Sequence, residues 1–263
     1  MFRVIDSHKL NHLRDMAVSY ANPDDLRRDG KVFFIGGNLP IYSTLETMYE
    51  SYCLESSELF HVTFGDESCF DHNLEIVRQI KRNFSIRVMG RVGYPLSDAQ
   101  IEKIYLAGLD VLDIPGTVYA ASADSERKRA AFSFAVATFK RWSVVSSISP
   151  QDSPLTVRAN IHELIGSGVI PLLEISRDDS GLSADEFRSL FEYLAAEWHG
   201  KHVPLKPIMP LLRLITPFVI AESSGFLRGV IEKLQDRHVL ATSDLRRHLR
   251  TSGAEASFES AGL

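Results

Sequence analysis

The most constraining feature of this sequence is the regular alternation of short apolar runs with longer amphipathic segments. The runs are rich in β-branched and aromatic residues, as buried strands are. They cover Lys31 to Ile35, Leu59 to Phe64, Ser85 to Met89, Asp110 to Ile114, Ser143 to Ile148 and Val169 to Ile175. Between the runs, apolar residues recur at i, i+3, i+4 and i+7, which is the spacing of one helix face. The alternation predicts a parallel sheet that is covered on both faces or closed into a barrel.

Local signals mark where the helices begin and end. Ser183 and Glu186 have the Ser-x-x-Glu spacing of a capping box, and they precede a strongly amphipathic segment that ends at Trp198. The same type of helix start is expected at Ser43 with Glu46, at Ser97 with Gln100 and at Ser153 with Pro154. Further signals are a helical pattern from Ser122 to Trp142 and two helix-ending glycines, Gly108 and Gly168.

The chain length favours a barrel. Eight strand–helix units take about 250 residues, and the chain has 263, which leaves room for a short N-terminal helix from about Ser7 to Tyr20. His202 to Ile208 and Pro217 to Ala221 are the expected seventh and eighth strands, although prolines make this region irregular. We therefore predict an α/β fold, a parallel (β/α) TIM-type barrel that is complete or partial. It would form a single domain over residues 1–250, followed by a flexible tail over residues 251–263.

Charge and cysteine content argue against several classes of partner. The chain has 29 Lys and Arg against 34 Asp and Glu, a net charge of −5, so it has no basic field for nucleic acid or anionic lipid. It has no apolar run of the roughly 20 residues that a membrane span needs, and its start lacks the apolar core of a secretory signal. The two cysteines, Cys53 and Cys69, fit a reducing compartment. These features predict a cytoplasmic protein for which nucleic acid and membranes are poor partners.

Candidate ligand-binding residues follow the predicted strands, because ligands of parallel βα folds bind at the carboxyl ends of the strands. The residues at these positions are Asn38, Gly65, Asp66, Glu67, Arg91, Asp113, Ser147, Glu174 and Arg177. The carboxylates of this set have the chemistry to bind a divalent metal, to hold an amine or to act as acid and base. The alternative is that several of them cap helices or form ion pairs with the arginines.

No other motif identifies a catalytic or metal site. His61 lies inside a predicted strand, where a core histidine is more common than a ligand. His8 and His12 are spaced i, i+4 on a predicted helix, but no third metal ligand accompanies them. Cys69 has no activating partner that the sequence reveals. We therefore assign no catalytic residue and no metal site.

Three stretches of the chain carry a family resemblance: Val62 to Glu67, Pro95 to Ile114 and His162 to Glu174. Together they resemble the barrel of the radical S-adenosylmethionine superfamily, in particular its biotin-synthase-like branch. In that family a motif after the second strand, usually Gly-Gly-Glu, contacts the amino group of the bound S-adenosylmethionine. The resemblance implies this role for Gly65, Asp66 and Glu67, and it implies an adenosyl compound as the ligand.

The chain departs from the family at the cluster-binding loop. The family has a Cys-x-x-x-Cys-x-x-Cys loop after the first strand, whereas this chain has Gly36 to Tyr42 there, without a cysteine. A [4Fe–4S] cluster normally needs three or four thiolates, so we expect none in this protein. The segment after the fifth strand, Ser147 to Asp152, also differs from the family's glycine-containing segment.

Two functions remain open. The first is an accessory or small-molecule-binding barrel that acts beside a cluster-bearing paralogous protein in the biosynthesis of a cofactor or metabolite. The second is a non-radical enzyme that uses the carboxylates at the barrel mouth for acid–base or metal-assisted chemistry. The lack of a nucleophile–base or metal signature favours the first. A buried carboxylate pair with shifted pKa values at Asp113 and Glu174 would favour the second.

Overall fold

The computed structural model describes residues 2–15, 22–54, 57–116, 123–150, 153–175 and 182–220. Its strands are β1 (Phe2–Ile5), β2 (Leu26–Asp29), β3 (Val32–Gly36), β4 (Leu59–Thr63), β5 (Arg87–Arg91), β6 (Val111–Asp113), β7 (Val144–Ile148), β8 (Ile170–Leu173) and β9 (Phe218–Ile220). Its α-helices are α1 (Ser7–Asp15), α2 (Ile41–Leu54), α3 (Phe70–Asn83), α4 (Asp98–Leu106), α5 (Ala123–Thr138), α6 (Pro154–Gly166), α7 (Ala184–Gly200) and α8 (Met209–Ile215). Two short 3₁₀ helices are η1 (Glu67–Cys69) and η2 (Lys206–Ile208).

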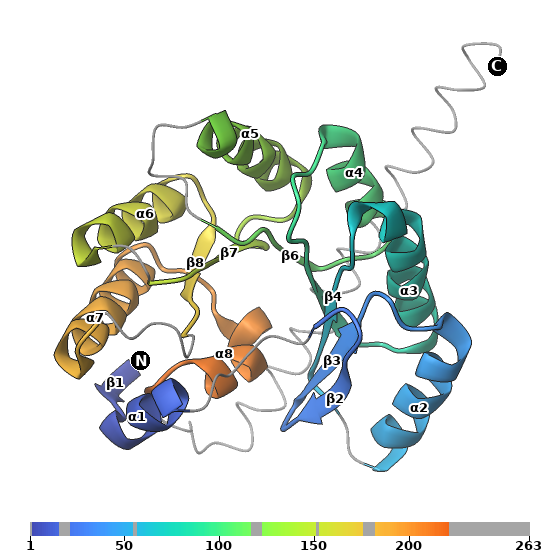
Figure 1. Ribbon diagram of the computed structural model, residues 1–263, viewed down its shortest axis with the longest axis horizontal. Coiled ribbons are helices and arrows are strands. Elements are labelled where there is room, and N and C mark those ends of the chain that lie inside the picture. Colours follow the sequence, from blue (N-terminus) through green and yellow to red (C-terminus); the bar gives the residue numbers. More distant parts are fainter. Residues whose placement is uncertain are drawn as a thin grey trace.

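A seven-stranded sheet organises the molecule, with the order β2-β3-β4-β5-β6-β7-β8. Strands β3 to β8 are parallel, and β2 pairs with β3 as an antiparallel edge strand. Helices α2 to α7 surround the outer side of this sheet (Figure 1). The predicted α/β class and the mostly parallel sheet are confirmed. Among the described residues no ladder joins β8 to β2, so the observed arrangement is compatible with a TIM-type fold without showing a closed barrel.

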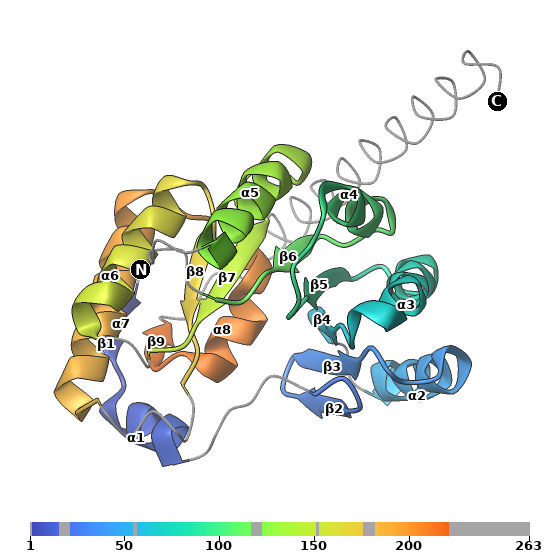
Figure 2. The same ribbon diagram turned by 45° about the horizontal axis from the view of Figure 1, so that its top comes forward.

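The last predicted strands differ from the structure. The segment expected as a seventh strand contains η2, with Pro207 in its first turn, and leads into α8. A strand does occupy the expected eighth position, but β9 pairs with β1 as a separate antiparallel ladder. Helix α8 lies between β8 and the β2–β3 hairpin (Figure 1, Figure 2). Its Leu214 side chain comes within 3.8 Å of the place that a Cβ on Gly30 would occupy.

Most of the predicted helix starts are correct. Ser183 and Ser97 form complete capping boxes with Glu186 and Gln100. The Ser153 hydroxyl accepts a hydrogen bond from the backbone N–H of Thr156 at 3.3 Å. Gly108 and Gly168 adopt positive φ angles, 109° and 87°, where the chain leaves α4 and α6.

The predicted start at Ser43 is wrong, because α2 already begins at Ile41. The Thr44 N–H donates to the Pro40 carbonyl at 3.2 Å, so the first helical turn forms immediately after this proline. Ser43 therefore lies inside the helix, where its carbonyl accepts a hydrogen bond from the Thr47 hydroxyl at 3.1 Å.

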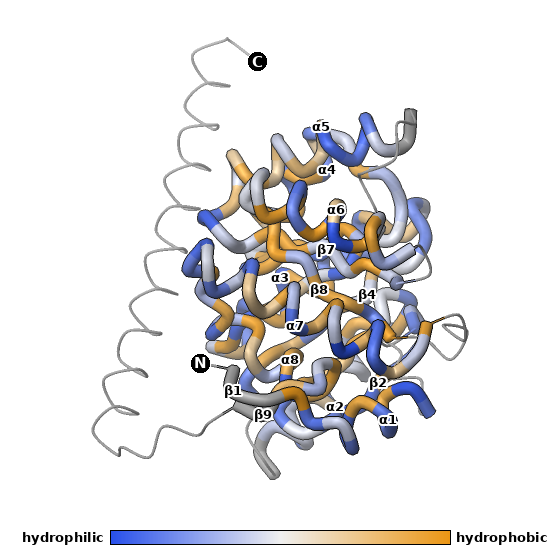
Figure 3. The backbone as a smooth tube through the Cα atoms, turned by 90° about the vertical axis from the view of Figure 1, so that its left-hand side faces the viewer, coloured by the Kyte–Doolittle hydropathy of each residue, from blue (hydrophilic) through white to orange (hydrophobic). Residues whose placement is uncertain are grey.

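The core lies between the sheet and its helices, and the parallel strands are buried along their length. Apolar residues line β8 and β7 in the middle of the molecule (Figure 3). An aromatic cluster packs α2 and α3 onto β4, with ring centroids of Phe60 and Phe84 5.2 Å apart and those of Tyr52 and Phe84 5.6 Å apart. This packing fixes the strands whose carboxyl ends carry the candidate residues.

Candidate functional site

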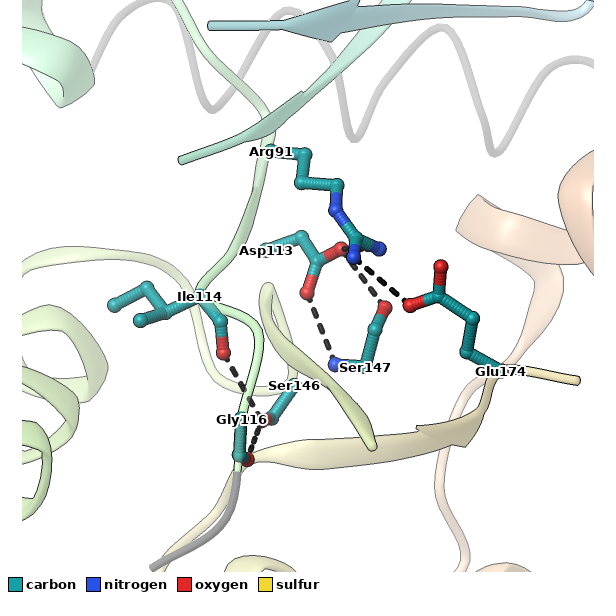
Figure 4. Close-up of polar contacts among 7 residues, drawn as sticks. All are labelled: Arg91, Asp113, Ile114, Gly116, Ser146, Ser147 and Glu174. Carbon is teal, nitrogen blue, oxygen red and sulfur yellow. Dashed lines mark hydrogen bonds and ion pairs between the residues drawn. The ribbon is translucent and has the colours of Figure 1, made fainter. Parts of the chain in front are cut away.

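Four of the predicted residues meet at the carboxyl ends of neighbouring strands. Arg91 ends β5, Asp113 ends β6, Ser147 lies in β7, and Glu174 follows β8. The parallel register pairs Arg91 with Asp113, which places both side chains on one face of the sheet. Figure 4 shows the four side chains converging, and we call them the Arg91 cluster.

Asp113 is the buried centre of this cluster. Its side chain has no exposed surface. The Ser147 backbone N–H donates to Asp113 Oδ1 at 3.1 Å, and the Ser147 hydroxyl donates to Oδ2 at 2.9 Å. Asp113 Oδ2 also lies 3.5 Å from Arg91 Nη1. The carboxylate is therefore held in one orientation by partners on two strands.

Arg91 connects this buried carboxylate to a second, more accessible one. Its Nη2 donates to Glu174 Oε2 at 2.8 Å, and the side chains of Arg91 and Glu174 are 16% and 24% exposed. A planar guanidinium suits such a bridge, because its N–H groups point in fixed directions. The cluster thus extends from the buried Asp113 carboxylate to the partly exposed Glu174 carboxylate.

Burial raises the pKa of Asp113 to about 6, and the nearby Glu174 carboxylate acts in the same direction. Arg91 and the hydrogen bonds from Ser147 oppose this rise. A carboxyl group with a pKa near 6 exchanges its proton close to neutral pH, which is what general acid–base chemistry requires. Asp113, which the sequence analysis selected as a candidate, is therefore a carboxyl group whose burial raises its pKa.

The neighbouring Ser146 has a different role, because successive strand residues point to opposite faces. Its hydroxyl lies 3.0 Å from the carbonyl oxygens of both Ile114 and Gly116 (Figure 4). These contacts hold the start of the loop after β6. Ser146 thus supports the backbone behind Asp113, whereas Ser147 contacts the carboxylate itself.

His61 is a fully buried residue of β4, as expected for a core histidine. Its ring packs against Phe34 with centroids 5.3 Å apart. Burial, followed by the charge of Arg91, lowers the pKa of His61 to about 3. The imidazole is therefore neutral at physiological pH.

Gly65 and Asn38 are brought together by loop packing. A Cβ on Gly65 would lie 2.1 Å from Asn38 Oδ1, so a larger residue at this position requires the exposed Asn38 side chain to move. The Gly65 N–H donates to Asn73 Oδ1 at 3.3 Å, and the Asn38 side chain donates to Asp24 at 3.0 Å. Sequence reasoning missed Asn73, since a polar residue on an amphipathic helix gives no sign that its amide turns inward.

Asp66 and Glu67 are both exposed where β4 leads into η1. Asp66 makes no side-chain cap to this 3₁₀ helix. Glu67 Oε1 accepts a hydrogen bond from Gln100 Nε2 at 3.2 Å. Glu67 also lines a cavity beside α4, whereas Asp66 does not.

This cavity has a volume of about 560 Å³, within the usual range for small-molecule sites. It lies between the loop after β5, the loop after β6 and the facing parts of α4 and α5. We call it the Glu67 cavity. Its lining residues are Glu67, Val92, Gly93, Tyr94, Pro95, Leu96, Ser97, Asp98, Gln100, Ile114, Pro115, Arg127, Lys128, Ala130 and Ala131.

Tyr94 is the most unusual residue of the cavity wall. Its hydroxyl oxygen is buried and has no hydrogen-bond partner within the part of the chain that the structure describes. Burial, with the charges of Glu67 and Cys69, raises the pKa of this phenol to about 12. The hydroxyl is therefore a neutral group with unused hydrogen-bonding capacity.

The predicted residues thus separate into the Arg91 cluster and a group around Glu67, and Arg177 lies outside the described residues. Sequence reasoning missed Tyr94 and Arg127, because their meeting depends on how α5 packs against α4. Within the described ranges, no three His, Cys, Asp or Glu side chains are grouped to hold a metal ion. None of the described helices has both the length and the apolar composition for crossing a membrane.

No protein-family model matches this chain, and no curated protein matches it either. The resemblance to the radical S-adenosylmethionine superfamily therefore stays a prediction from the quoted stretches of sequence.

Proposed function

We propose that this protein binds a small molecule in the Glu67 cavity and acts as an accessory protein in the biosynthesis of a cofactor or metabolite. The observation that carries the proposal is the cavity itself, at the carboxyl end of the parallel sheet, where ligands of such folds bind. Its volume, its apolar walls and its few polar groups are those of a small-molecule site.

The charges on the walls suggest the class of ligand. Glu67 and Asp98 lie on one side, and Arg127 and Lys128 come from α5 on the other. A ligand with both an ammonium and an anionic group matches this distribution better than a purely cationic or anionic one. S-adenosylmethionine or a related adenosyl compound has this character, and the family resemblance points to the same ligand.

The accessory role rests on the cysteine content. The chain has two cysteines, too few for the thiolates that a [4Fe–4S] cluster normally needs. Radical chemistry on the bound compound would belong to a cluster-bearing paralogous partner. This chain would supply the binding site and orient the ligand.

A thermal-shift experiment tests ligand binding. S-adenosylmethionine at about a hundredfold excess over Kd should stabilise the native state by ~2.7 kcal/mol, which raises the melting temperature by roughly 5–10 °C. Glu67→Gln removes the charge that faces the ammonium group, so the shift should shrink. Glu58→Gln, an exposed site just before β4 at the opposite end of the sheet, is the matched control and should keep the full shift. Equal shifts in all three proteins would contradict binding beside Glu67.

A second candidate function is acid–base catalysis, and the fully buried Asp113 with a pKa of about 6 favours it. In this reading the substrate displaces the Glu174 side chain from Arg91 to reach the buried Asp113, which then exchanges a proton with it, and Arg91 positions the substrate. A metabolite extract incubated with the wild-type protein should then lose one compound and gain another. Asp113→Asn should abolish the conversion. An unchanged extract with the wild-type protein would favour the binding role.

A further inference from the structure

The two carboxylates of the Arg91 cluster are held very differently. Asp113 accepts two hydrogen bonds from Ser147 in addition to its ion pair with Arg91. Glu174 has one side-chain partner among the described residues, the Arg91 guanidinium. Asp113 is therefore a fixed anchor, and Glu174 is attached only through the arginine.

Glu174 is also the accessible member of the pair. Its side chain is 24% exposed, whereas that of Asp113 is fully buried. The residue lies beyond the end of β8, and its backbone N–H donates to the Ile148 carbonyl at 2.9 Å. Rotation of the side chain would move the carboxylate into water without breaking this backbone contact. An anion that takes the place of Glu174 leaves Arg91 paired, so the exchange avoids the main cost of breaking a mostly buried ion pair, which is an uncompensated buried charge.

We propose that Arg91 is a binding group for a small anion, a carboxylate or a phosphate, which replaces the Glu174 carboxylate on the guanidinium. Glu174 occupies the site as an internal competitor. When the anion binds, Asp113 and Ser147 keep Arg91 in place, and Glu174 turns outward into solvent.

The geometry of Arg91 suits this exchange. Nη2 already holds a carboxylate oxygen at 2.8 Å, so the same N–H can donate to an oxygen of an incoming anion. The side chain is mostly buried but retains 16% exposure, which keeps the guanidinium reachable and strengthens its interactions. The buried Asp113 carboxylate attracts the guanidinium from the other side, with Oδ2 3.5 Å from Nη1.

This site is separate from the Glu67 cavity, so it needs nothing from the proposed binding of an adenosyl compound. It names the substrate class for the second candidate function, an anion that would lie beside the titratable Asp113. The two ideas fail independently, since Glu67 variants test one and Glu174 variants test the other.

The test is an NMR titration of the side-chain Nε–Hε signal of Arg91, with sodium phosphate and sodium acetate in separate series at constant ionic strength. A saturable shift is expected, and the anion that binds more tightly identifies the ligand as a phosphate or a carboxylate. Glu174→Gln should tighten binding by at least about fivefold, because it removes a charged competitor whose pair with Arg91 is less exposed, and so less screened by solvent, than an ordinary surface ion pair. This variant keeps Asp113 and Ser147, so the guanidinium stays oriented.

Two further variants complete the experiment. Glu58→Gln makes the same change of net charge at the amino ends of the strands and should leave the affinity unchanged. Arg91→Lys keeps the charge but loses the planar fork and the Nε–Hε signal. Its affinity, followed through the backbone amide signal of Ser147 in both proteins, should be weaker than that of the wild type. The proposal is overturned if neither anion gives a saturable shift, or if Glu174→Gln and Glu58→Gln change the affinity equally.

Discussion

Ser147 donates to both oxygens of the buried Asp113 carboxylate, from its backbone N–H at 3.1 Å and from its hydroxyl at 2.9 Å. The backbone contact belongs to the β6–β7 region of the sheet, so it persists in most Ser147 variants. The hydroxyl contact depends on the side chain alone. A substitution of Ser147 can therefore remove the hydroxyl hydrogen bond to Asp113 and keep the backbone one.

Replacing Asp113 by Asn should change how stability depends on pH. The pKa of Asp113 is raised from 3.8 to about 6 in the folded protein, so the folded state binds more protons than the unfolded state between these values. The free energy of unfolding of the wild type therefore falls by up to roughly 3 kcal/mol as pH rises from about 4 to 6. Asp113→Asn should lack this decline, which urea unfolding across the pH range measures. Parallel profiles for the two proteins would show that Asp113 is not perturbed by burial.

Ser147→Ala should raise the pKa of Asp113 further, because the hydroxyl hydrogen bond stabilises the charged carboxylate. It should also cost about 1–2 kcal/mol of stability. Titration of the Asp113 carboxyl carbon by NMR measures the first effect. Ser146→Ala is the matched control, since Ser146 contacts the carbonyls of Ile114 and Gly116 instead. An equal change in the Asp113 titration in both variants would contradict the direct role of Ser147.

Gly65→Ala should destabilise the protein by about 1 kcal/mol, because the added Cβ would lie 2.1 Å from Asn38 Oδ1 and would move the exposed Asn38 side chain away from its hydrogen bond with Asp24. Asn38→Gly removes the obstructing side chain, so the double variant should recover part of the loss. A double-mutant cycle by urea unfolding measures this coupling. Strictly additive effects would mean that Asn38 is not what requires a glycine at position 65.

Ser183→Ala should destabilise α7 by about 1 kcal/mol, because the Ser183 side chain accepts a hydrogen bond from the Glu186 backbone N–H. Ser43→Ala should cost less, because Ser43 lies inside α2 and alanine favours a helix interior. Thermal unfolding of the two variants compares these positions directly. A larger loss at Ser43 would contradict the observed start of α2.

The sequence predicted the parallel strands and all four residues of the Arg91 cluster because those features depend on local patterns. Buried strands are marked by apolar runs, and the carboxyl-end rule then selects Arg91, Asp113, Ser147 and Glu174. The contacts of Asp113 and Glu174 with the Arg91 guanidinium follow from the register of the sheet, which the sequence does not reveal. The pKa shift of Asp113 depends in turn on that packing.

The remaining features are non-local. The β1–β9 ladder joins residues such as Ile5 and Phe218 from opposite ends of the described chain, and strands this short give little periodic signal. Tyr94 and Arg127 meet at the Glu67 cavity only because α4 packs beside α5. No spacing in the sequence encodes that contact.

Binding of an adenosyl compound in the Glu67 cavity can be seen in a crystal structure of the protein grown with saturating S-adenosylmethionine. We expect density for the compound in the Glu67 cavity, with its ammonium group beside Glu67 and its carboxylate toward Arg127 and Lys128. The hydroxyl of Tyr94 should gain a hydrogen-bond partner in this complex. An empty cavity, or density for the compound elsewhere, would mean that the Glu67 cavity is not the binding site for S-adenosylmethionine.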